Sequence, residues 1–277
     1  MLTVLTQNIG QSILHESENS FVPSTLVILA FKNLFQLFFM LSSEHRQLLT
    51  NHFAQYISDH KKEFITRVLD QRTRHITMVM ENIYQSQNAS AVVRTCECMG
   101  LQDVHIIEDQ SKYQVNIKVL KGSNKWLDLI RYKTKNINNS EACFNVLREK
   151  GYKIIVTDPS PGCLSIDEVS VQDKIAIVMG NELKGISSYA QEHCDLRVKI
   201  PMYGFTESMN ISVSAAICMN TLMPKLRNSS VDWHLSEEEK KETRLQWFRK
   251  VVRKSDIVER EFLSKLGPSS IPAEPNS

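Results

Sequence analysis

Three short groups of polar and small residues stand among apolar stretches of this sequence. Asn88 is followed six residues later by Arg94, with apolar residues filling much of the space between them. A second group runs from Gly180 to Gly185 and holds Asn-Glu between its glycines, and a third lies at 208–214. An arginine among apolar neighbours needs an anionic partner, and glycine turns let backbone amides approach a ligand closely. Together these groups could hold a hydroxyl and a neighbouring phosphate.

Each group also has a purely structural interpretation. Arg94 could form an ion pair with Glu97, which follows three residues later and shares its helix face. Asn88, Ser208 and Asn210 could cap helices. The glycines alone fit a tight turn, although a simple turn explains the Asn-Glu pair between them less well.

Familiar catalytic motifs are absent from the sequence. It has no G-x-G-x-x-G, H-E-x-x-H or G-x-S-x-G. Gly180 and Gly185 have the spacing of a P-loop, but Lys184 precedes the second glycine and Ile186 fills the required lysine position. We therefore do not expect an NTPase.

The six cysteines are scattered, and the single C-x-C pair, Cys96 and Cys98, has no accompanying histidine pattern. We expect free thiols in a reducing compartment, no metal site and a cytoplasmic location.

Short apolar strands alternate with helical stretches over 75–228. Such alternation predicts an α/β fold with a mostly parallel sheet covered on both faces. The three polar groups then lie at the carboxyl ends of strands, where ligands bind in such sheets. Strands are expected at 76–80, 104–107, 153–157, 175–179 and 196–200, and helices at 88–99, 140–150, 186–194 and 210–227, the last kinked or ended by Pro224.

Charged helical blocks flank this region. The pattern over 44–74 is helical, and its basic residues form either a solvated face or a patch for phosphates. A second block over 235–265 opens with the capping residue Ser236 and carries Trp247 and Phe248, which either dock on the core or stack on RNA. The tail from 267 is expected to be disordered. The basic residues of the first block are Lys61, Lys62, Arg67, Arg72 and Arg74.

Residues 1–39 differ from the rest of the chain. Their apolar stretch is interrupted by Lys32 and Gln36 and is too short to span a membrane. Met40 looks like a natural start, with Ser43 able to cap a helix. We expect residues 1–39 to be dispensable.

Composition is that of an ordinary globular protein. The chain has 277 residues, a formal net charge of +2, 42% hydrophobic residues and 23% charged residues, which excludes disorder as the main state. A charge this small means that any surface for nucleic acid must come from local patterning.

Taken in order and spacing, the three groups resemble the motifs of the SpoU branch of the SPOUT methyltransferases, over about 75–228. That resemblance implies an α/β SPOUT fold with a C-terminal trefoil knot, an exception to the rule against knots. It also implies helical extensions at 40–74 and 229–266, similar to those of members that methylate a guanosine ribose of tRNA. The first extension is too short for the globular RNA-binding domain of some ribosomal-RNA relatives.

The resemblance further implies transfer of a methyl group from S-adenosyl-L-methionine to a ribose 2′-hydroxyl of tRNA, at D-loop guanosine 18, by a homodimer with its active site near the subunit interface. The alternatives are a ribosomal-RNA 2′-O-methyltransferase of the same family and a catalytically silent RNA-binding protein. Met209 stands where the family more often has Leu, a change that conserves apolar volume. The cofactor-binding residues implied are Thr157, Gly180, Ile200 and Met209.

The catalytic role falls on Arg94 in this resemblance. Because a guanidinium stays protonated in proteins, we expect Arg94 to hold the phosphate and polarise the hydroxyl. The residues expected to orient Arg94 and the ribose are Asn88, Glu182, Ser208 and Asn210.

Overall fold

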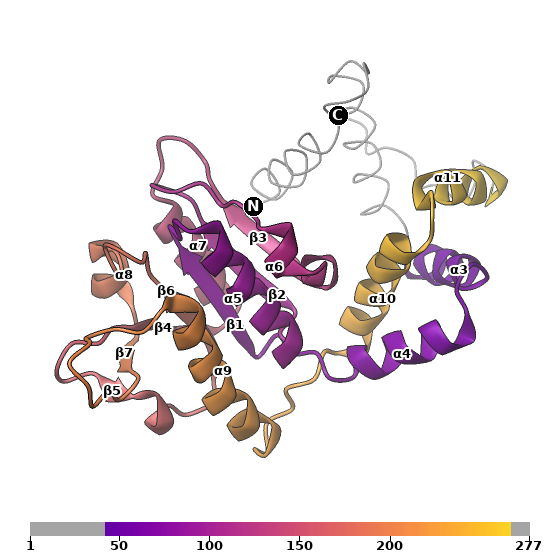
Figure 1. Cartoon of the computed structure of the whole chain (residues 1–277). Helices are drawn as coiled ribbons and strands as arrows, with labels where there is room; N and C mark the ends of the chain where they lie inside the picture. The colour runs from indigo at the N-terminus through magenta and orange to yellow at the C-terminus, as the bar shows by residue number, and fades with distance from the viewer. Residues whose placement is uncertain (1–41, 267–277) are drawn as a thin grey trace. The chain divides into compact units, whose positions relative to one another are not determined.

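A seven-stranded sheet, parallel throughout, forms the centre of the chain in the computed structural model, which describes residues 42–266 (Figure 1). Its order is β3-β2-β1-β6-β4-β7-β5. The strands are β1 (Ile76–Glu81), β2 (Asp103–Ile107), β3 (Asp128–Tyr132), β4 (Tyr152–Thr157), β5 (Leu164–Ser165), β6 (Lys174–Met179) and β7 (Leu196–Lys199).

Alternation along each strand divides the core into two apolar layers. In β1, Met78 and Met80 belong to one layer and Val79 to the other. Helices α5 (Ser86–Met99) and α9 (Ile211–Arg227) pack together in the first layer, and α7 (Asn139–Glu149) and α8 (Ser188–His193) supply residues to the second. A parallel sheet buried on both faces is the arrangement that near-continuous apolar strands require.

The strand order places late strands among earlier ones. β6 lies between β1 and β4, and β7 pairs with both β4 and β5. Neighbouring strands whose connections run in opposite directions leave a crevice at their carboxyl ends. The fold class expected from the sequence is confirmed.

The expected strands and helices are present in this part of the chain, with boundaries that shift by one or two residues. Asn88 is not a cap, because α5 begins two residues earlier and its N-cap is Gln85. Pro224 does not end α9, which continues to Arg227. The short elements that the sequence reading missed are β3, β5, α6 (Ile117–Leu120) and the 3₁₀ turns Ser123–Trp126 and Ile166–Glu168.

The flanking blocks form helices of their own. The helical pattern expected over 44–74 is present as two helices, α3 (Ser43–Ala54) and α4 (Asp59–Leu69), separated at 55–58. The second block is also two helices, α10 (Glu237–Val251) and α11 (Ser255–Leu266). Ser236 forms a capping box with Glu239, as expected. Trp247 and Phe248 are buried within the unit in which α10 packs against α3 and α4, so their rings are not exposed for stacking on RNA.

Contacts divide the chain into two compact units. One contains residues 72–234, and the described part of the other contains 42–71 and 235–266. The expected boundaries lie at 74/75 and 228/229. The expectations for residues 1–39, for a start at Met40 and for the tail from 267 concern residues outside the described range. None of the helices between residues 42 and 266 combines the length and apolar character needed to cross a bilayer.

Only part of the expected basic patch of the first block is available to phosphates. Arg72 is buried and pairs with Glu97 at 2.7 Å. Arg74 pairs with Asp103 at 2.9 Å and with Asp128 at 2.7 Å. Both arginines therefore serve the structure of the core.

Candidate active site

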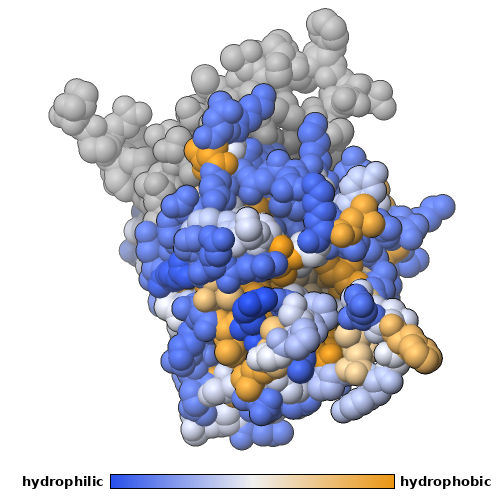
Figure 2. All heavy atoms as spheres, turned by 90° about the vertical axis from the view of Figure 1, so that its left-hand side faces the viewer, coloured by the Kyte–Doolittle hydropathy of each residue, from blue (hydrophilic) through white to orange (hydrophobic). Residues whose placement is uncertain are grey.

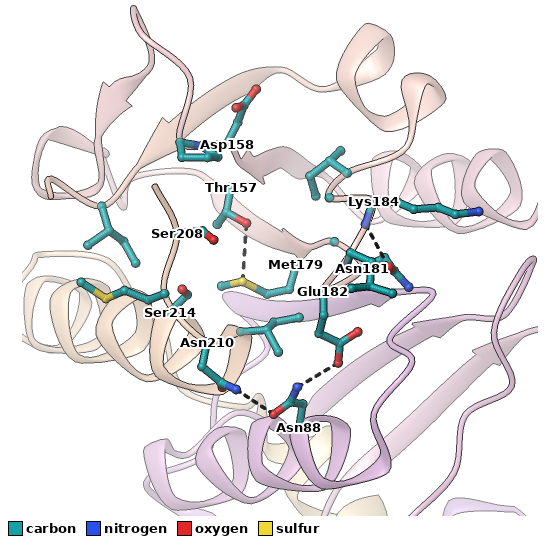
Figure 3. A pocket seen from close by; sticks show the side chains of 18 of the residues that line it. Asn88, Thr157, Asp158, Met179, Asn181, Glu182, Lys184, Ser208, Asn210 and Ser214 are labelled. Carbon is teal, nitrogen blue, oxygen red and sulfur yellow. Dashed lines mark hydrogen bonds between the residues drawn. The ribbon is translucent and has the colours of Figure 1, made fainter. Parts of the chain in front are cut away.

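A cavity of about 590 Å³ opens at the carboxyl ends of β4, β6 and β7. Its walls combine apolar side chains, such as Met179, Val198 and Ile211, with polar ones. Figure 2, which faces the side bearing β5 and α8 in Figure 1, shows hydrophobic atoms gathered toward the centre of this face among hydrophilic ones. A mixed lining of this kind suits an amphipathic small molecule. Among the lining residues are Asn88, Thr157, Gly180, Glu182, Ile200, Ser208, Met209 and Asn210 (Figure 3).

The turn after β6 is closed by its own backbone. Asn181 and Gly185 exchange two N–H···O bonds of 2.8 Å. A Cβ on Gly180 would lie 2.4 Å from the carbonyl carbon of Gly185 and 2.5 Å from the nitrogen of Ile186. Gly180 is therefore required by the close approach of two backbone segments, and Gly185 by its φ of +70°.

Glu182 projects from this turn to the start of α5. Its Oε1 accepts from Asn88 Nδ2 at 2.9 Å and from the Gln85 backbone N at 3.2 Å, and its Oε2 accepts from the Tyr84 backbone N at 2.9 Å. Burial would raise the pKa of Glu182, but the bonds from Asn88 and from these backbone amides outweigh it and lower the pKa. The ionised carboxylate lies where a helix N-terminus favours negative charge.

Asn88 connects this carboxylate to the third motif. Its Oδ1 accepts from Asn210 Nδ2 at 3.1 Å. Asn210 is the N-cap of α9, and its Oδ1 accepts from the Ser212 backbone N at 2.8 Å. The capping role considered for Asn210 is therefore confirmed, and the same side chain fixes the start of α9 against α5. Figure 3 shows Asn88 between Glu182 and Asn210, joined to each by a hydrogen bond.

The remaining pocket residues predicted from the sequence have different environments. Thr157 donates from Oγ1 to the Val178 carbonyl at 3.0 Å, so its side chain is committed to the neighbouring strand. Ile200 is half-buried and Met209 is exposed. The Ser208 hydroxyl has no hydrogen-bond partner among residues 42–266 and does not cap α9, so it is available to a ligand.

Asp158 is a pocket residue that the sequence reading missed. It lies directly after β4, accepts from the Ser160 backbone N at 2.9 Å and pairs with Arg197. Burial would raise its pKa, but the bonds from Ser160 and Arg197 lower it. An aspartate directly after a buried strand was a signal that could have identified it.

Arg94 is the one predicted site residue that does not line the cavity. It lies six residues after Asn88 on α5, which turns it about 120° around the helix axis. Its Nη1 donates to the Val119 carbonyl of α6 at 3.4 Å, while Glu97 pairs with Arg72. The ion pair with Glu97 considered above is therefore absent, and Arg94 faces away from the cavity of its own chain.

A parallel α/β fold with a polar crevice at its strand ends defines a small-molecule-binding enzyme scaffold, and comparison with known proteins specifies which one. Residues 75–220 match the SpoU rRNA Methylase family. The chain is 43% identical over 206 residues to a tRNA (guanosine(18)-2′-O)-methyltransferase of Borreliella burgdorferi, covering 74% of this chain and 92% of that one. The protein described here belongs to the SpoU methyltransferase family.

Two further relatives add detail. The crystal structure of the Aquifex aeolicus TrmH/SpoU tRNA modifying enzyme superposes with a TM-score of 0.61 at 26% identity, over 71% of this chain and 98% of that one. A 23S rRNA (guanosine-2′-O-)-methyltransferase of Neisseria meningitidis is 34% identical, but the match covers 52% of this chain and only 56% of that protein.

Proposed function

We propose that this protein is a tRNA (guanosine(18)-2′-O)-methyltransferase that uses S-adenosyl-L-methionine and acts in the cytoplasm. One observation carries the proposal: the similarity to the Borreliella tRNA enzyme covers 92% of that enzyme, so it extends beyond the core into the flanking helices. The match to the ribosomal-RNA enzyme covers 56% of that protein and is therefore less informative about substrate.

The cavity suits the cofactor. Its volume of about 590 Å³ lies within the range of about 300–1,000 Å³ usual for small-molecule sites. Apolar side chains from β6 and β7 offer contact to an adenine ring, and Gly180, Ile200 and Met209 line the same cavity. The cofactor supplies a sulfonium methyl group.

The chain's own residues then position the acceptor. The Ser208 hydroxyl is free to bind a ribose oxygen. Asn88 binds both Glu182 and Asn210, so these three side chains join the segments that form the cavity wall. Arg94, which remains protonated, binds the phosphate beside the target ribose and polarises the 2′-hydroxyl.

A homodimer makes these roles compatible. Arg94 faces away from the cavity of its own chain, so it serves a cavity only if a second copy brings one to it. Because a two-fold dimer presents the same surface from both subunits, it would form two such shared sites. We therefore include a dimer in the proposal.

A methyl-transfer assay tests the function. Purified protein and labelled S-adenosyl-L-methionine are incubated with unmodified tRNA and with ribosomal RNA, and the product nucleotide is mapped. We expect 2′-O-methylguanosine at position 18 of tRNA. Transfer to ribosomal RNA alone would establish the alternative enzyme, and binding of tRNA without transfer would establish a silent scaffold.

A further inference from the structure

A group of cations around Arg94 has no role in the cavity and no acidic partner. The stretch 110–127 contains four lysines and neither Asp nor Glu. All four are exposed, and three of them, Lys118, Lys121 and Lys125, lie in or next to α6 and the 3₁₀ turn that follows it. None of the three, nor Arg94, forms an ion pair within residues 42–266.

The lack of partners is a local property of this surface. Other arginines of the core are paired with carboxylates: Arg72 with Glu97, and Arg131 with Glu108 at 2.6 Å. The acidic residue nearest Arg94 on α5 is thus already bound to another arginine. Uncompensated positive charge on a chain whose net charge is only +2 indicates a surface that binds an anion.

The elements that carry these cations are fixed to one another. Ser90 and Arg94 lie one turn apart on α5, and both contact α6: Ser90 Oγ accepts from the Asn116 backbone N at 2.7 Å, and Arg94 donates to Val119 O. Figure 1 shows α6 beside α5. The four cations therefore belong to one surface.

Hydrogen bonds at both ends of α6 fix the backbone that carries Lys118 and Lys121. The Asn116 side chain caps α6 by accepting from the backbone N of Lys118 and of Val119. Lys121 ends the helix in a left-handed conformation with φ of 51°, and Ser123 Oγ donates to the Leu120 carbonyl at 2.7 Å. A lysine in that conformation is uncommon, and the surrounding bonds maintain it. The ammonium groups thus extend from a fixed base.

We propose that Lys118 and Lys121, with Lys125 at the edge, bind the phosphate backbone of tRNA on either side of the nucleotide whose phosphate Arg94 holds. The inference rests on the proposed function and extends it by assigning the residues that align the substrate strand. Several cations on one surface can each contact a different phosphate, so they suit the successive phosphates of a single RNA strand.

The proposed dimer brings the cavity of a second copy to Arg94, so that copy is the competing occupant of the neighbouring α6, where Ile117 is 78% exposed. A two-fold contact through this surface would place the same lysines opposite one another. Like charges across an interface are unfavourable. RNA is therefore the occupant that the charges favour.

The test compares the Lys118→Ala/Lys121→Ala double variant with Lys153→Ala/Lys174→Ala. The control lysines lie at the starts of β4 and β6, away from the carboxyl ends that form the cavity. Lys153 pairs with Asp173 near the start of β4, and Lys174 is the first residue of β6. Methyl transfer is measured over a range of tRNA and salt concentrations, and S-adenosyl-L-methionine binding is measured by calorimetry.

We expect the double variant to raise KM for tRNA at least about tenfold and to reduce the slope of log affinity against log salt by about 1.4–1.8, the effect of losing two phosphate contacts. Cofactor affinity should not change, kcat should change little, and Lys118→Arg/Lys121→Arg should restore KM. The control should behave as the wild-type protein.

Two results would overturn the inference. One is an unchanged KM and salt slope in the double variant. The other is a shift to monomer in sedimentation, which would assign the surface to a subunit contact. If the wild-type protein transfers no methyl group to tRNA, the proposed function fails, while the salt slope of tRNA binding still tests the lysines.

Discussion

Asn88 donates from Nδ2 to Glu182 Oε1 at 2.9 Å, joining the start of α5 to the turn after β6. The opposite side of the same amide accepts from Asn210. One amide thus couples all three polar motifs, and both of its hydrogen-bonding functions are used by neighbouring motifs.

The Asn88→Ala variant should lose both connections. Removing an amide that binds a carboxylate and a helix cap costs about 1–2 kcal/mol, seen as a fall in Tm of about 3–6 °C. Scanning calorimetry of the variant beside Gln87→Ala, an exposed neighbour on the same turn, measures this. Equal Tm values for the two variants would show that the amide contributes nothing.

Glu182 should make stability depend on pH in the acid range. Its pKa in the folded protein lies below the usual 4.5, so the folded state binds fewer protons than the unfolded state. The stabilisation is therefore complete above about pH 5 and is lost as pH falls through the lowered pKa.

Urea unfolding between pH 3 and pH 7 checks this for the wild-type protein, Glu182→Gln and the exposed control Glu192→Gln. The Glu182→Gln variant should start less stable at pH 7, because an amide nitrogen would face backbone donors, and should lose less on acidification. Parallel curves for wild type and Glu182→Gln would contradict the assignment.

The two glycines of the second motif should differ sharply when replaced by alanine. Gly180→Ala forces a Cβ to 2.4–2.5 Å from backbone atoms, so the turn must open and cofactor binding should fall by at least about tenfold. Gly185→Ala meets no atom within 4 Å and carries only left-handed strain of about 1–2 kcal/mol. Calorimetric titration with S-adenosyl-L-methionine compares them, and equal affinities would refute the close-approach argument.

Arg94→Ala should strongly reduce turnover while leaving cofactor affinity nearly intact, since Arg94 does not line the cavity of its own chain. Loss of one charged donor at a reacting group costs about 10²–10³ in kcat. Single-turnover methylation and cofactor titration measure the two quantities. A variant with near-wild-type turnover would end the assignment of Arg94.

Mixing subunits tests where Arg94 acts. If sites are shared across a dimer, combining Arg94→Ala with Gly180→Ala chains should regenerate one intact site in each mixed dimer and restore about a quarter of wild-type activity. No restoration, with mixed dimers present by native mass spectrometry, would place Arg94 in its own chain's site.

The sequence predicted the buried strands because their apolar runs are nearly unbroken. It missed β3, where Asp128 and Arg131 look like loop residues but are bound to Arg74 and Glu108. Those ion pairs join residues from different parts of the chain, so no local pattern reveals them. The break after Ala54 was readable, because Ser58-Asp59 is a helix-start signal.

The candidate site was predicted as a set of residues, and its connections were not. Spacing alone cannot show that Glu182 binds the amide of Asn88 or that Arg94 leaves the cavity, because both depend on how α5 is rotated against the sheet. The resemblance assigned roles to these residues, but only the packing of α5 against the sheet shows where their side chains point.

The interleaved strand order determines when, during synthesis of the chain, the cavity can form. Residues before 110 and residues after 195 contribute walls to the same cavity, and β7 must enter between strands made earlier. A nascent chain that ends before Asn210 would hold all seven strands of the sheet but would lack α9, which supplies part of the cavity wall. The methyl donor can therefore stabilise only chains long enough to include the start of α9, and its retention on ribosome-bound intermediates of increasing length would show when α9 packs against the sheet.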